Sequence, residues 1–149
     1  MELIYKEEAY GLIGACFEVY NEMGSGFLED VYQEALEREL DRRSLPFVSK
    51  PKLEIWYKGS LLTKKYEPDL VASSKIIVEL KAVSNLTDEH RAQVHNYLKA
   101  SSFRLGLLIN FGKPKELQYE LHRPIISSNR RFVQFVRFVV PPFSCPKTI

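Results

Sequence analysis

The fold of this chain is decided by the stretch Pro68-Asp69-Leu70-Val71-Ala72-Ser73-Ser74-Lys75-Ile76-Ile77-Val78-Glu79-Leu80-Lys81. Two short runs, at 69–72 and 76–80, read as strands, and the polar residues between them predict a tight turn. If the runs pair as antiparallel strands, Asp69 and Glu79 lie toward the same end of the hairpin. Glu79 and Lys81 are two residues apart on one strand, so they point to the same face. The sequence therefore predicts that two carboxylates and one ammonium group converge.

Two amphipathic helices are expected before this hairpin, at 5–23 and 27–43, separated by Gly24-Ser25-Gly26. In each, apolar residues recur at the three- and four-residue spacing of one helix face. The first stripe is Ala9, Leu12, Ile13, Cys16, Phe17 and Tyr20, and the second is Leu28, Val31, Tyr32, Ala35, Leu36 and Leu40. The pattern predicts that both stripes face a common core.

Around the hairpin, strands are expected at 47–48, 53–57 and 61–66, with a turn at 58–60. Thr87 is a good N-cap for a helix over 88–100, and the apolar run 105–109 is typical of a buried strand. A strand–helix–strand unit over 76–109 implies a parallel crossover in an otherwise antiparallel sheet. The fold class predicted is therefore α/β or α+β, a mixed sheet with helices packed on it.

Composition points to one globular domain. The chain has 149 residues, 45% of them hydrophobic and 27% charged, which disfavours disordered and fibrous classes. No run approaches the ~18 apolar residues that a membrane span needs, and no secretory signal pattern opens the sequence. Two cysteines, Cys16 and Cys145, form no disulfide framework. We expect a protein of the reducing cytoplasm that does not engage a membrane.

Charge is distributed unevenly along the chain. Residues 1–46 hold 4 Lys and Arg against 11 Asp and Glu, a balance of −7, and residues 47–149 hold 17 against 8, a balance of +9. A basic sheet region could attract a polyanion such as nucleic acid. Solvated strand faces also often carry lysines, so the pattern leaves both interpretations open.

The predicted Asp69, Glu79 and Lys81 group suits divalent-cation chemistry. Carboxylate oxygens hold Mg²⁺ while open positions accept water and phosphate, and an adjacent lysine can orient or deprotonate the attacking water. The alternative is an ordinary set of solvent-facing ion pairs. Glu79 argues against that alternative, because it interrupts an apolar run where an unpaired carboxylate costs free energy.

Further motifs carry a resemblance to a known family. They are the G-x-x-E-x-x-Y pattern of Gly26–Tyr32, then Tyr57-Lys58-Gly59, Asp69-Leu70, the run 78–83, Gln93 with Tyr97, and the run 106–112. Together they resemble the GxxExxY proteins, which are placed in the PD-(D/E)XK nuclease superfamily. The resemblance covers about the first three-quarters of the chain and implies a restriction-endonuclease-like mixed sheet flanked by helices. We expect this nuclease-like domain to span 1–123, with 124–149 as a C-terminal extension of uncertain structure. The resemblance also implies that Asp69 and Glu79 are metal ligands and that Lys81 is the catalytic lysine.

The resemblance suggests roles for two helical positions besides these. Glu29 falls on the edge of the second apolar stripe, where it would reach inward as a third metal-binding and catalytic carboxylate, as an N-terminal helical acid does in related nucleases. A first-turn glutamate stabilised by the helix dipole is the alternative. His90, Gln93 and Tyr97 share one helix face, and Gln93 with Tyr97 matches the Q-x-x-x-Y element of RecB-type nucleases. We expect these three to contact substrate, with His90 in a supporting position and a packed aromatic as the alternative for Tyr97.

The function predicted is hydrolysis of phosphodiester bonds in nucleic acid, with DNA as the favoured substrate and Mg²⁺ or Mn²⁺ as cofactor. One alternative is a catalytically silent nuclease-fold protein that binds nucleic acid or a protein partner. Another is a structural subunit whose apolar C-terminal tail docks on a partner. The chain leaves little room for a separate recognition domain, so a homodimer or a protein partner would supply specificity.

Overall fold

Two packed helices open the chain. In the computed structural model, which describes residues 2–125, α1 spans Lys6–Met23 and α2 spans Glu29–Arg42. Gly24 and Gly26 lie between them at φ angles of 67° and 111°. Glycine adopts such angles without the steric cost that a Cβ would bring. The two predicted helices and the glycine-rich connection are confirmed.

The predicted apolar stripes are correct on their inner side and wrong on their outer side. Buried as predicted are Ala9, Leu12, Ile13, Cys16, Tyr32, Leu36 and Leu40. Phe17 and Val31 are exposed, however, and Leu28, at the N-cap of α2, is 79% exposed. The face of α2 that turns inward carries Gln33, which is 5% exposed and hydrogen-bonds the backbone of Asp69. A polar contact thus replaces part of the expected apolar one.

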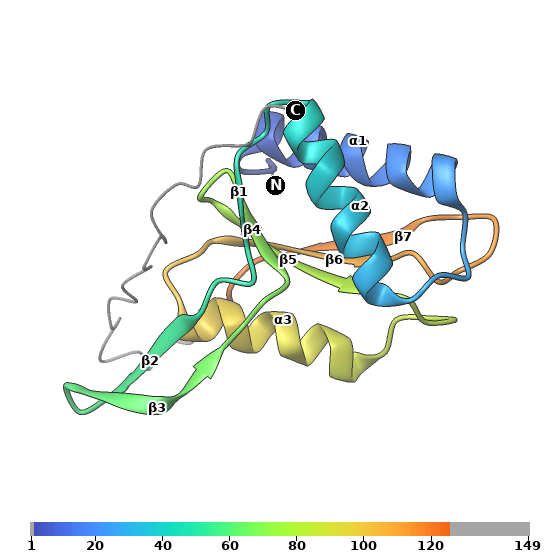
Figure 1. Cartoon of the computed structure of the whole chain (residues 1–149). Helices are drawn as coiled ribbons and strands as arrows, with labels where there is room; N and C mark the ends of the chain where they lie inside the picture. Colours follow the sequence, from blue (N-terminus) through green and yellow to red (C-terminus); the bar gives the residue numbers. More distant parts are fainter. Residues whose placement is uncertain (1, 126–149) are drawn as a thin grey trace.

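A five-stranded mixed sheet forms the centre of the molecule (Figure 1). Its strands run in the order β1 (Phe47–Ser49), β4 (Leu70–Ala72), β5 (Ile76–Lys81), β6 (Leu105–Asn110) and β7 (Gln118–His122). The β5–β6 pair is parallel and the other pairs are antiparallel. The mixed sheet and its parallel crossover are confirmed, whereas β7 is a strand that the sequence analysis did not predict.

Helices cover both faces of this sheet, with α1 and α2 on one side and α3 (Asp88–Ala100) on the other (Figure 1). Side chains alternate along β5, so Ile76, Val78 and Leu80 join the core under α1 and α2. Ile77 joins the core under α3. Gly106 lets α3 approach closely, because a Cβ there would lie 2.7 Å from the Val94 side chain.

Strands β2 (Leu53–Tyr57) and β3 (Ser60–Tyr66) pair only with each other. This β2–β3 ribbon extends from the body of the molecule, and the predicted hairpin is confirmed (Figure 1). In the part of the chain that the structure describes, its base is anchored by Leu53 and Tyr66, which pack against the core that includes Tyr97 and Leu98 of α3. The sequence pattern of a hairpin does not distinguish this free ribbon from two strands of the main sheet.

Cys16, which belongs to the first apolar stripe, is a buried free cysteine. Cys145 and all but the first two residues of the expected extension at 124–149 lie outside the described residues. No helix within residues 2–125 combines the length and the apolar character needed to cross a membrane.

Candidate active site

The register of the β4–β5 hairpin sets Asp69 opposite Glu79. Leu70 pairs with Val78 in this antiparallel pair, so continuing the register by one residue brings the two acids together. Asp69 Oδ2 accepts a hydrogen bond of 2.7 Å from the backbone N–H of Leu80. This contact fixes the carboxyl group of Asp69 against the strand that carries Glu79.

The backbone of Asp69 is held as firmly as its side chain. Its carbonyl oxygen accepts hydrogen bonds from Gln33 Nε2 at 2.7 Å and from the backbone N–H of Lys50 at 2.8 Å. Gln33 is a positioning residue that the sequence analysis missed. The available signal was its place one turn after Glu29, since residues four apart on a helix lie on the same face.

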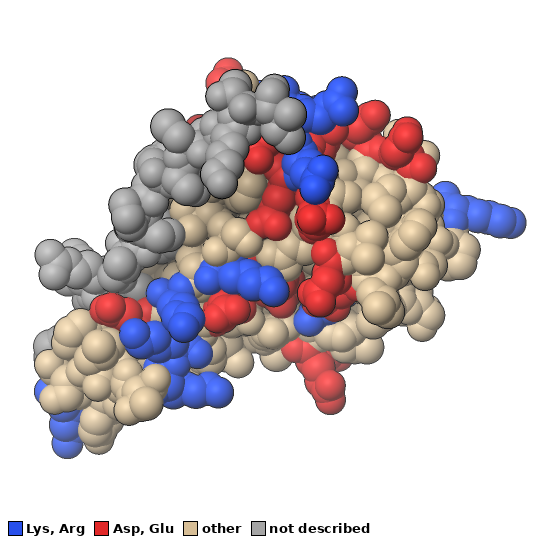
Figure 2. All heavy atoms as spheres, viewed as in Figure 1, with Lys and Arg blue, Asp and Glu red and all other residues tan. Residues whose placement is uncertain are grey.

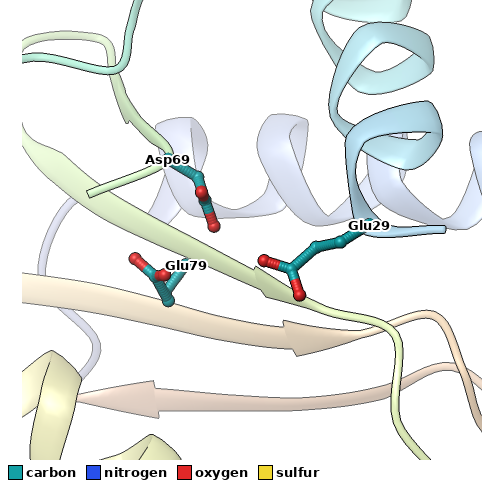
Figure 3. Close-up of side chains that lie close together, drawn as sticks. All are labelled: Glu29, Asp69 and Glu79. Carbon is teal, nitrogen blue, oxygen red and sulfur yellow. The ribbon is translucent and has the colours of Figure 1, made fainter. Parts of the chain in front are cut away.

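Glu29 reaches the same place from the first residue of α2. Glu29, Asp69 and Glu79 each offer a carboxylate oxygen, and these three oxygens all lie within 4.8 Å of one another. Figure 3 shows the three side chains directed toward a shared space between α2 and the hairpin. The two strand acids and the helix acid that the sequence analysis singled out are therefore brought together.

Burial makes this carboxylate cluster electrostatically unfavourable without a cation. Desolvation is the largest cause of a raised pKa at all three acids, and the charge of Asp69 adds to it at both glutamates. The pKa of Glu79 rises to about 8. The Glu79 side chain is almost fully buried, and its Oε2 atom has no hydrogen-bond partner among residues 2–125. A buried acceptor of this kind costs free energy unless it is satisfied.

The donor set therefore fits a hard divalent cation. Three converging carboxylates supply the oxygen ligands that Mg²⁺ and Mn²⁺ prefer. A cation would neutralise the mutual repulsion and would give the unpartnered Glu79 oxygen a ligand to bind. Lys81 offers this cluster a partial countercharge, with its Nζ atom 3.7 Å from Glu79 Oε1, and the charge of Lys50 acts on Asp69 as well.

Lys81 is held by α3. Its Nζ atom donates a hydrogen bond of 2.9 Å to Gln93 Oε1, and Gln93 Nε2 donates one of 2.9 Å to the hydroxyl of Tyr97. Tyr97 is buried, packs edge-on against Tyr66 and has its pKa raised by desolvation. Tyr97 thus packs in the core and also hydrogen-bonds the residue that holds Lys81. The substrate contact expected of Gln93 and Tyr97 stays a prediction.

The structure places His90 in the cap of α3. Its Nδ1 atom accepts a hydrogen bond of 3.1 Å from the backbone N–H of Thr87, and its own backbone N–H donates one of 3.4 Å to Thr87 Oγ1. The predicted N-cap is thereby confirmed. Desolvation lowers the pKa of His90, and the neighbouring Lys81 charge lowers it further. The substrate contact expected of His90 stays a prediction.

A mixed sheet between helices, with acids and a lysine gathered at the end of its central hairpin, defines an α/β protein with a candidate cation site. The sequence pattern of the PD-(D/E)XK nuclease superfamily matches residues 6–123, so the chain belongs to that superfamily. The narrower resemblance to the GxxExxY proteins remains a prediction.

Comparison with solved structures supports the fold alone. The structure described as "Crystal structure of SSO0001" is similar, with a TM-score of 0.54 and 21% sequence identity. The match covers 66% of this chain and 52% of that one, so it spans about half the length of the similar protein. No curated protein is significantly similar to this chain.

Proposed function

We propose that this protein is a metal-dependent nuclease that hydrolyses phosphodiester bonds of nucleic acid, with DNA as substrate and Mg²⁺ or Mn²⁺ as cofactor. One observation carries the proposal: oxygens of three carboxylates lie within 4.8 Å of one another, and Lys81 lies beside them, held by a hydrogen bond to Gln93. Membership of the PD-(D/E)XK nuclease superfamily supports the same reaction class. The family match ends at residue 123, which supports a nuclease-like domain over 1–123.

Glu29, Asp69 and Glu79 would hold the cation. When bound there, it would lower the pKa of a coordinated water and stabilise negative charge on the scissile phosphate. The three acids have distinct supports: the helix start for Glu29, the Leu80 N–H for Asp69, and the buried strand for Glu79.

Lys81 would assist the attacking water. Its ammonium group is restrained by Gln93 Oε1 at 2.9 Å and lies 3.7 Å from Glu79 Oε1, which leaves N–H donors for water or a phosphate oxygen. Hydrolysis adds the water oxygen to phosphorus and breaks one phosphorus–oxygen ester bond, and the departing oxygen takes up a proton. Lys81 can orient that water or accept its proton. Along α3, Gln93, Tyr97 and His90 would border the substrate.

Direct measurement of strand cleavage tests this proposal. Purified protein is incubated with plasmid DNA, duplex and single-stranded oligonucleotides, and RNA, with Mg²⁺, Mn²⁺ or chelator. We expect cleavage of DNA that requires the cation and is lost in Asp69→Asn, which keeps an acceptor for the Leu80 N–H. Lack of cleavage in every condition, or equal cleavage by Asp69→Asn, would contradict the proposal.

A further inference from the structure

The β2–β3 ribbon stands apart from the five-stranded sheet. Within residues 2–125 its two strands pair only with each other, and every residue of β3 from Ser60 to Lys65 is exposed. Within the described residues, Leu53 and Tyr66 at its base join the core, and β2 is half-buried from Glu54 to Trp56. The exposed part of the arm, β3 and the turn, is available to contact another molecule.

The ribbon is strongly basic. Five lysines are exposed on it or at its base: Lys50, Lys52, Lys58, Lys64 and Lys65. Between residues 50 and 66 the only acid is Glu54. Within the described residues 2–125, none of the five lysines forms an ion pair with a carboxylate. Figure 2 shows Lys and Arg gathered over this ribbon, while Asp and Glu follow the middle of the same face.

Lysines lie on both faces of the ribbon, and Glu54, directly across from Lys65, offsets part of the charge on the Lys65 face. Lys64 and Lys65 are consecutive residues of β3, so their side chains point to opposite faces. Lys58 stands at the turn, and the exposed apolar side chains of Leu61 and Leu62 lie between these charges along the chain. A flat anionic partner would contact the lysines of one face and leave those of the other face unused. A partner that presents anionic groups on both sides of the ribbon matches this distribution better.

We infer that the β2–β3 ribbon is an arm that enters the major groove of double-stranded DNA and places its lysines against the phosphates on both sides; this inference rests on the nuclease proposal. The major groove of B-DNA is about 12 Å wide and admits a two-stranded ribbon. The major groove of A-form RNA is deep and narrow, so it does not accept such an arm. Duplex DNA is therefore the substrate class that the ribbon fits.

The ribbon connects directly to the candidate active site. β3 ends at Tyr66, three residues before Asp69, and the ring of Tyr66 lies 5.5 Å from that of Tyr97, which hydrogen-bonds Gln93. At about 3.4 Å per residue, the seven residues of β3 extend roughly 24 Å. That length corresponds to about seven base pairs at ~3.4 Å each. The arm would thus hold the duplex up to about seven base pairs from the scissile phosphate.

Exposed lysines have another established use, because charges on free strands prevent edge-to-edge pairing between copies. The two roles are separable by experiment. A DNA-binding arm loses affinity for DNA when its lysines are neutralised. A protective role predicts instead that the same change promotes self-association and leaves DNA affinity unaltered.

The test is equilibrium binding of a fluorescent DNA duplex by the full chain in chelator, measured over a range of salt concentrations. The variant Lys64→Gln/Lys65→Gln is compared with Lys6→Gln/Lys115→Gln, which removes two exposed lysines outside the ribbon. Each phosphate contact contributes about 0.9 to the slope of log affinity against log salt. We expect the ribbon variant to lose about 1.8 from that slope and to bind at least about tenfold more weakly, while the control matches the parent. An RNA duplex should bind more weakly than DNA.

Three results would overturn the inference: an unchanged slope in the ribbon variant, equal losses in both double variants, or equal affinity for duplex RNA and duplex DNA. Sedimentation of each variant detects self-association, and self-association with unchanged DNA binding would also overturn it. Thermal unfolding verifies that the variants fold. The nuclease proposal is tested separately, since cleavage depends on Asp69 and this binding assay contains no divalent cation.

Discussion

The amide of Gln93 lies between Lys81 and Tyr97, accepting a hydrogen bond from the Lys81 ammonium at 2.9 Å and donating one to the Tyr97 hydroxyl at 2.9 Å. Because an amide presents its donor and its acceptor at opposite atoms, this arrangement fixes both partners at once. The helix on one face of the sheet therefore sets where the lysine of β5 points. In the proposed nuclease, Gln93 would position Lys81 for the water that it assists.

Replacing Gln93 with leucine tests this positioning. The Gln93→Leu variant removes the acceptor for Lys81 with little change in size, so we expect cleavage to fall by about 10- to 100-fold while metal binding persists. Asn96→Leu, at an exposed position of the same helix, is the matched control and should cleave normally. Equal rates for the parent and Gln93→Leu would show that Lys81 needs no such support.

Cation binding should stabilise the fold. Glu29, Asp69 and Glu79 offer oxygens within 4.8 Å of one another, and a cation there replaces the proton that Glu79 retains, so Mn²⁺ or Mg²⁺ should raise the melting temperature by mass action. At 100 times the dissociation constant, the gain is about 2.7 kcal/mol, or roughly 5–11 °C for a domain of this size. Thermal scans of Asp69→Asn and Glu79→Gln should show no such gain. A parent-like shift in both variants would place the cation elsewhere.

Comparing substitutions of Glu29 and Asp30 tests whether Glu29 binds the metal or only stabilises the helix. Both Glu29 and Asp30 lie in the first turn of α2, where either can stabilise the helix dipole, but only Glu29 approaches the strand acids. We expect Glu29→Gln to weaken metal binding, measured by calorimetry, with little change in stability. Asp30→Asn should leave metal binding intact. If both changes cost a similar few tenths to ~1 kcal/mol and neither affects metal affinity, Glu29 serves the helix only.

The central hairpin could be predicted because its determinants are local. Thirteen residues from Asp69 to Lys81 contain both strands and the turn, so the alternation of side chains alone placed Glu79 and Lys81 on one face. The inward position of Glu29 on its helix also follows from periodicity. Its approach to Asp69 does not, because it depends on how α2 packs on the sheet, and only the family resemblance suggested it.

Other features depend on tertiary contacts that a periodic pattern does not encode. Strand β7 carries polar residues such as Gln118 and Glu120 at the edge of the sheet, so its apolar signal is weak. Val31, expected in the apolar stripe, is exposed. Gln33 is buried instead, and its amide donates a hydrogen bond to the carbonyl of Asp69, which is distant in sequence. The helix position of Gln33, one turn after Glu29, showed which face it occupies, but its contact with the Asp69 carbonyl depends on how α2 packs on the hairpin.

The stability of the metal-free protein should depend on the pKa of Glu79. Burial, with a further contribution from Asp69, raises this pKa from its usual 4.5 to about 8. The folded state therefore keeps a proton that the unfolded chain releases, and the contribution of Glu79 to stability falls as pH rises from about 4.5 to about 8. Chemical denaturation should show this loss in the parent relative to Glu79→Gln.

The difference in unfolding free energy between the parent and Glu79→Gln isolates the effect of Glu79. His90 and His95, whose pKa values are lowered by burial, are present in both proteins and cancel in the difference. Excess Mn²⁺ should reverse the trend in the parent, since the cation competes with the proton. If the stability of the parent rises relative to Glu79→Gln between pH 5 and 8 without metal, Glu79 is not a proton-retaining acid.

The central claim is tested most directly by the cleavage rate of Lys81→Met at saturating Mn²⁺, measured on the best DNA substrate of the parent. Methionine keeps most of the side-chain stem and removes the charge, so the fold and metal binding should persist, as the melting temperature with and without Mn²⁺ would show. We expect the rate to fall by about 10²–10⁴-fold, the usual contribution of a positioned acid or base. An undiminished rate in a folded, metal-binding Lys81→Met protein would contradict the account.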